Sequence, residues 1–213
     1  GGLVWVLACA LLEVTLTQAL LLLAPLVLVP LGMELIERSK TGLVPTALGR
    51  GLTWLQLPAA VLLVGSFGFP QGSRTAVCLA IPWLLWTCMA AVIGAVRLKA
   101  HRLGSLAEVT RTVGLLYLAG AGTWTVITRG GWRPLGFDAE IVRLTAMHLH
   151  YVGFSLPLLA AVAWERLRNS NANSAAAGTA CVGSIGGFPL VASAMTLRQL
   201  GGPGVVELVA VAL

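Results

Sequence analysis

Charged side chains are scarce in this sequence. Aspartate, glutamate, lysine and arginine make up 10% of the 213 residues, whereas about a quarter of a soluble domain is charged. Hydrophobic residues reach 57%, and the mean hydropathy is +0.88. These values exclude a soluble globular domain and indicate an integral membrane protein. The apolar runs are continuous and often approach about 20 residues, so they predict membrane-crossing α-helices rather than the alternating strands of a barrel.

Paired cysteines and the usual nucleotide or metal motifs are also lacking. The four cysteines, Cys9, Cys78, Cys88 and Cys181, lie inside apolar segments and form no CxxC pair, so we interpret them as small buried hydrophobes. No P-loop, HExxH or aspartate-rich motif occurs. We therefore expect no metal and no cofactor. The net charge of +6 does not indicate nucleic acid, because the basic residues lie in short loops beside apolar runs.

The apolar runs predict one transmembrane domain over residues 1–213. We expect six full spans, over about 3–23, 52–67, 75–98, 107–128, 142–166 and 174–197. The final "VVELVAVAL" reads as a seventh span that is cut short. Pro25 and Pro30 are expected to break or kink the chain after the first span.

The loop charges predict an orientation. With these spans, nine lysines and arginines fall on one side of the membrane and five on the other. Because the side richer in basic residues is usually cytoplasmic, we expect the N-terminus to lie outside. The predicted location is the cell membrane, which in bacteria is the inner membrane.

Glu13 is the most conspicuous polar residue of the predicted first span. It lies about ten residues into that span between Leu12 and Val14, and Thr17 follows one helical turn later. Ionisable side chains inside a membrane are costly and tend to face a cavity or a partner. Glu13 is therefore a candidate catalytic acid, and the alternative is a carboxyl group that hydrogen-bonds a neighbouring helix.

His148, His150 and Tyr151 lie in the first half of the predicted fifth span. Two residues two positions apart on a helix point about 200° away from each other, so the two histidines are poorly placed to share a metal. We favour His148 as the histidine that faces the bundle interior. The alternative for either residue is a buried histidine whose hydrogen bonds are satisfied.

Comparing depths in the predicted spans suggests a single cavity in the outer half of the bundle. Glu13, His148 and His150 would supply the catalytic groups. The residues expected to bind substrate are Thr17, Trp83, Trp86, Trp124 and Tyr151. Tryptophans also gather at membrane interfaces; Trp5, Trp132 and Trp164 fit that role, whereas Trp83 and Trp86 lie deeper.

Three stretches resemble the YndJ-like family of bacterial membrane proteins: "LLLLAPLVLVPLGMEL", "RPLGFDAEIVRLTAMHLHYVGFSLPLLA" and "GGFPLVASAM". The most specific block is "LTAMHLHYVGF", with matches at Thr145, His148, His150, Tyr151, Gly153 and Phe154. This resemblance implies a polytopic membrane fold and says little about activity.

In size and layout the sequence is also similar to the integral-membrane terpene cyclases. That resemblance implies a metal-free enzyme that protonates an alkene or epoxide of a prenylated small molecule, for example a prenyl indole. Glu13 would donate the proton with His148 or His150 as its partner, while aromatic faces stabilise the cation. The expected partners are then this hydrophobic molecule and the lipid bilayer. Two alternatives remain open: a small-molecule transporter or exporter, and a non-catalytic membrane subunit that binds a ligand.

Overall fold

The computed structural model describes residues 1–12, 14–37, 46–100, 105–170 and 173–201. Every regular element in these residues is helical, which confirms the predicted all-α class for this part of the chain. With η marking a 3-10 or π turn, the elements are α1 (Gly2–Leu11), α2 (Leu16–Leu23), η1 (Ala24–Leu28), α3 (Val29–Glu37), α4 (Thr46–Ser66), α5 (Arg74–Ala100), α6 (Leu106–Gly130), η2 (Pro134–Gly136), α7 (Ala139–His148), η3 (Leu149–Ser155), α8 (Leu156–Asn169) and α9 (Ala175–Gln199).

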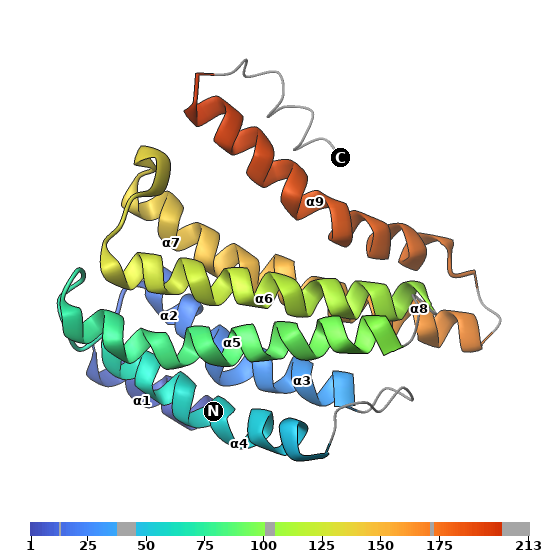
Figure 1. Cartoon of the computed structure of the whole chain (residues 1–213), viewed down its shortest axis with the longest axis horizontal. Helices are drawn as coiled ribbons and strands as arrows, with labels where there is room; N and C mark the ends of the chain where they lie inside the picture. The colour runs from blue at the N-terminus through green and yellow to red at the C-terminus, as the bar shows by residue number, and fades with distance from the viewer. Residues whose placement is uncertain (13, 38–45, 101–104, 171–172, 202–213) are drawn as a thin grey trace.

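The helices lie side by side in one bundle (Figure 1). Four helical runs in the described residues are long and apolar enough to cross a membrane: Leu16–Glu37, Arg74–Lys99, Ala139–Asn169 and Ala175–Gln199. Helix α4 is apolar over the shorter range Gly51–Ser66. The membrane bundle is therefore confirmed, whereas the count of six or seven spans and the outside N-terminus stay predictions. The seventh predicted span falls in residues 202–213, outside the described residues.

The first crossing differs from the predicted one. Helix α1 ends at Leu11, and a new helix begins at Leu16. Thr15 caps it: its hydroxyl accepts the N–H of Gln18, while the Gln18 side chain accepts the N–H of Thr15. This capping box starts a helix afresh inside an apolar run. The indole of Trp5 donates to the carbonyl of Ala19 at 2.7 Å, so α1 folds back along α2.

Of the predicted break or kink at Pro25 and Pro30, the break is wrong, because the helical run continues from Leu16 to Glu37, while the kink stays a prediction. Pro25 lies in η1, a π-helical segment that joins α2 to α3 without interrupting the rod. A π-bulge accommodates a proline by changing the local hydrogen-bond pattern. The side chain of Gln56 in α4 donates to the carbonyl of Pro25, so a neighbouring helix helps to satisfy this segment.

Helix α6 is the centre of the bundle. It packs against α5 on one side and against α7, η3 and α8 on the other (Figure 1). Glycine allows the close approach to α5: a Cβ at Gly122 would overlap the hydroxyl of Thr87 and approach the Cα of Leu84 to 3.2 Å. A Cβ at Gly94 would come within 3.0 Å of Leu115. Small residues at such contacts favour helix packing in membranes.

Two arginines near the ends of the predicted spans 75–98 and 107–128 are buried inside helices. Arg97 in α5 and Arg111 in α6 are each 3% exposed. Glu108 lies between them, 3.2 Å from Arg97 and 2.7 Å from Arg111. Arg111 also pairs with Glu165 of α8. The sequence pattern shows the positive charges but not their partners, two of which lie on other helices.

Helix α9 is the most loosely covered of the four candidate spans. Of its most apolar stretch 17% is buried, against 44% to 50% in the other three. It packs on α8 at its beginning and diverges from α7 towards its end (Figure 1). The diverging part of α9 forms one wall of a groove.

Candidate functional site

The predicted site residues that the structure describes do not all line one cavity. His150 lies in η3 and is fully buried. Its Nδ1 donates to the carbonyl of Ala146 at 2.8 Å, and its Nε2 accepts the indole N–H of Trp83 at 3.3 Å. Both ring nitrogens are therefore used within the core. His150 fits the alternative of a buried histidine with satisfied hydrogen bonds.

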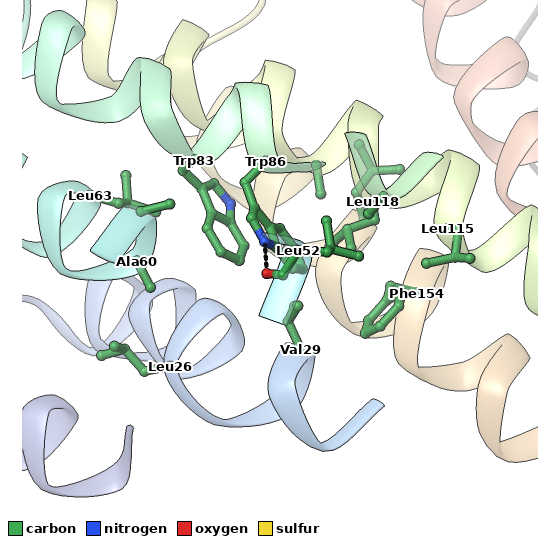
Figure 2. Close-up of a cluster of buried hydrophobic side chains, with 14 of the residues drawn as sticks. Leu26, Val29, Leu52, Ala60, Leu63, Trp83, Trp86, Leu115, Leu118 and Phe154 are labelled. Carbon is green, nitrogen blue, oxygen red and sulfur yellow. Dashed lines mark hydrogen bonds between the residues drawn. The ribbon is translucent and has the colours of Figure 1, made fainter. Parts of the chain in front are cut away.

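Trp83 and Trp86 belong to the same packed core. Their rings stack with centroids 5.1 Å apart and planes 12° apart. The indole of Trp86 donates to the carbonyl of Leu52 at 2.8 Å, as the dashed line in Figure 2 shows. Figure 2 also shows Leu63 and Val29 against this pair. Buried tryptophans usually find such a partner for the N–H, and here the partners tie α5 to η3 and α4.

Tyr151 joins two helical segments, whereas the contact of Thr17 is local. The hydroxyl of Tyr151 donates to the carbonyl of Leu20 at 2.9 Å, which joins η3 to α2. The hydroxyl of Thr17 lies 3.2 Å from that of Thr15 at the start of α2. Glu13, the predicted acid, lies outside the described residues.

Among the described residues, His148 and Trp124 are the two predicted site residues that line one common cavity. The cavity is a groove of about 350 Å³ between α6, α7 and α9. His148 is exposed, and its ring stacks on Phe188 of α9 with centroids 6.0 Å apart. The expectation that His148 faces the interior is therefore wrong. His150 is the inner residue because the indole N–H of Trp83, on another helix, reaches it.

Two apolar stripes form the walls of the groove. On α7 the lining residues are Ile141, Leu144, Thr145, Met147 and His148, and on α9 they are Phe188, Val191, Ala192, Met195 and Thr196. Both sets follow the spacing of one helix face. This spacing in α9 is the sequence signal that could have found the second wall.

The groove is chemically simple. The hydroxyls of Thr145 and Thr196 donate to carbonyls one turn earlier in their own helices. Among the described lining residues His148 is the one titratable group. The arrangement suits an apolar molecule with at most one polar contact. No cluster of three or more His, Cys, Asp or Glu side chains that could hold a metal occurs in the described residues.

A second cavity of about 250 Å³ lies between α3, α4 and α5. Glu34 and Glu37 line it together with Trp86 and Gln56. The carboxylate of Glu37 accepts a hydrogen bond from Thr53 at 3.3 Å. Among the described residues of the predicted site, this cavity is lined by Trp86, whose N–H already donates to Leu52.

The fold and the groove define an all-α integral membrane protein with an apolar recess on one face. The chain belongs to the YndJ-like protein family, whose model matches residues 19–213. It is similar to the "Uncharacterized membrane protein YndJ" of Bacillus subtilis (strain 168), with 27% identity over 146 residues, which cover 68% of this chain and 26% of that protein. The chain thus spans about a quarter of that relative's length. No solved structure matches it.

The family match confirms the resemblance seen in the sequence and the location in a membrane. It also accords with the quoted stretches, which all fall within residues 19–213. The name of this relative states no activity. A function for this chain therefore has to be inferred from the groove and its residues.

Proposed function

We propose that this chain binds a hydrophobic small molecule from the bilayer in the groove between α7 and α9. The observation that carries the proposal is a cavity of about 350 Å³ between two apolar stripes. Small-molecule sites are typically apolar recesses of about 300–1,000 Å³ with few polar groups. The loose cover of α9 gives an apolar molecule a lateral route from the lipid.

The lining favours an elongated, unsaturated ligand such as a prenylated molecule. Trp124, Phe137 and Phe188 offer aromatic faces, while Met147 and Met195 supply adaptable apolar surface. The imidazole of His148 is the polar group available to a ligand's hydroxyl or ring nitrogen. A charged ligand would find no counter-charge among these lining residues.

A terpene cyclase is the narrower form of this proposal. Of the predicted catalytic residues, His148 alone lies in the groove among the described residues. The cyclase therefore depends on a protonated His148 as the acid, with Trp124 and Phe188 beside the developing cation. His150, Trp83 and Trp86 have packing roles in this scheme.

Photo-crosslinking tests the binding proposal. A farnesylated indole that carries a diazirine and an alkyne is added to membranes containing the chain, illuminated, and its adducts are mapped by mass spectrometry. We expect adducts on α7 and the second half of α9, and competition by unlabelled farnesylated indole. Ala192→Phe should abolish them because it fills the groove. Ser193→Phe is the matched control, since Ser193 is exposed and outside the lining.

The result that overturns the proposal is labelling that follows lipid exposure on all helices and ignores Ala192→Phe. A second arm tests the narrower form with unlabelled farnesylated indole and its terminal epoxide. A product of unchanged mass and new retention time, lost in His148→Phe while crosslinking persists, would support the cyclase. Crosslinking without product would leave a non-catalytic binding protein.

A further inference from the structure

Two buried nitrogens without hydrogen-bond partners point to a second site, at the start of α7. Among the described residues the buried unpartnered side-chain atoms are Nε of Arg129 and Nε of Arg143. Both arginines line the same small cavity, of about 30 Å³. It lies at the end of the bundle where the turns from α4 to α5 and from α6 to α7 meet (Figure 1).

Arg129 carries a buried positive charge. It is 4% exposed, and its Nη2 donates to the carbonyls of Ser66 and Phe69, each at 2.7 Å. Its guanidinium lies 4.5 Å from the centroid of the Phe67 ring. These contacts fix the group in position but supply no negative charge, and no carboxylate of a described residue pairs with it. A buried charge without a counter-charge is costly.

Arg143 and the start of α7 line the same cavity. Arg143 pairs through Nη2 with Glu140, which leaves its Nε unpartnered. Ala139, the first residue of α7, lines the cavity, and the N-cap Asp138 makes no side-chain cap hydrogen bond. The N–H groups of a helix's first turn and its dipole favour an anion. With Glu140 paired to Arg143, the cavity retains the charge of Arg129.

We propose that this cavity binds a small oxyanion with the chemistry of phosphate, held by the guanidinium groups of Arg129 and Arg143. Guanidinium recognises phosphate through paired N–H donors. The amides of Gln18 and Gln71, which also line the cavity, are further polar contacts. A volume of about 30 Å³ is about twice what one water needs. It accepts a small anion or a phosphate corner and excludes an organic ligand.

The phosphate can come from solution or from a phospholipid headgroup, and the test separates these sources. The full chain, delipidated in a neutral detergent, is titrated with sodium phosphate at constant ionic strength. It is titrated separately with dioleoyl-phosphatidylglycerol. The readout is the shift of the thermal unfolding midpoint on ligand addition, so a variant of lower stability still reports binding.

We expect one of the two probes to raise the midpoint in the unmodified chain. Arg143→Gln should weaken its apparent affinity about tenfold, because a charge-assisted hydrogen bond is lost. Arg143→Lys keeps the charge and should lose less. Arg129→Gln should abolish the shift. Arg133→Gln is the matched control and should change nothing, since Arg133 is an exposed arginine of the same loop region outside the cavity lining.

Three outcomes would overturn the proposal. The first is no midpoint shift with either probe in the unmodified chain. The second is an equal loss of affinity in Arg143→Gln and Arg133→Gln, which would indicate general surface charge. The third is a shift that appears only after Glu13→Gln, because the chain's own carboxylate would then be the anion.

Discussion

The replacement Arg111→Met tests whether the buried ion network holds three helices together. Nη1 of Arg111 donates to Glu108 at 2.7 Å and to Glu165 at 2.9 Å, and Nη2 donates to Glu165 as well. Glu108 also accepts a hydrogen bond from Arg97 at 3.2 Å. Arg111 therefore links α6 to α8 directly and to α5 through Glu108. Methionine keeps an apolar stem of similar shape but removes the guanidinium.

The expected cost follows from the exposure of each partner. The Glu108 side chain is 7% exposed and the Arg111 side chain 3%, so this pair is buried. Breaking a buried pair costs about 3–5 kcal/mol because it leaves an uncompensated charge. The Glu165 side chain is 41% exposed, so its contact contributes about 0–1 kcal/mol. Glu108 keeps Arg97, which places the expected loss near the lower limit, at about 3 kcal/mol.

The assay is equilibrium unfolding in mixed micelles with a denaturing detergent, followed by tryptophan fluorescence. A loss of about 3 kcal/mol changes the unfolding equilibrium constant by about a hundredfold. Arg143→Met is the matched control, because its pair with Glu140 is more exposed and should contribute about 0–1 kcal/mol. Arg111→Lys should recover only part of the loss, since lysine cannot form the forked contact with Glu165.

If Arg111→Met destabilises the protein no more than Arg143→Met does, the buried ion network does not hold the three helices together. Full recovery by Arg111→Lys would contradict a role for the forked contact, because charge alone would then suffice. If Glu165→Gln destabilised the protein as much as Arg111→Met does, the lost stability would come from the exposed contact between Arg111 and Glu165. That result would contradict a dominant contribution from the buried pair with Glu108.

Three further changes are measurable by the same unfolding assay. His150→Phe should cost about 1–3 kcal/mol because it leaves the indole N–H of Trp83 buried without an acceptor. Adding Trp83→Phe should recover part of that loss. If the losses of the two single variants simply added in the double variant, the contact between His150 and Trp83 would be contradicted. Gly122→Ala should cost about 1–3 kcal/mol through overpacking. Its control is Gly183→Ala, where the new methyl group meets nothing within 4 Å and should be neutral or stabilise the protein by about 0.5–1 kcal/mol. Equal effects of the two substitutions would refute the close approach of α5 and α6. Tyr151→Phe should cost about 1 kcal/mol through the lost hydrogen bond, and no change would show that the hydroxyl is dispensable.

The fold class was predictable because it depends on apolar length alone. Long runs such as 75–98 coincide with α5, and the family match follows from the quoted stretches. The break before α2 was harder to predict. The pattern of Thr15 followed three residues later by Gln18 is a capping signal, but hydropathy on both sides favours one continuous span. A short-range hydrogen-bond motif decided the structure there.

The candidate site was predictable only in part because depth does not determine neighbours. The two histidines do diverge, as two positions on a helix require. Which of them faces inwards depends on Trp83, a residue 67 positions away in the chain. The groove likewise needs α7 beside α9, and spacing within one helix cannot show that.

The two proposed sites share no lining residue and should bind independently. Ala139 and Arg143 are one turn apart and face the anion cavity. The groove residues Ile141 and His148 are rotated by about 180–200° from Ala139 around the helix, whereas Met147 lies one turn beyond Arg143. One ligand would have to extend along α7 to touch both sites. Saturating phosphate or phosphatidylglycerol should therefore leave the farnesyl labelling of α9 unchanged. Competition between them would contradict two separate sites and indicate a single amphiphilic ligand that displaces α7.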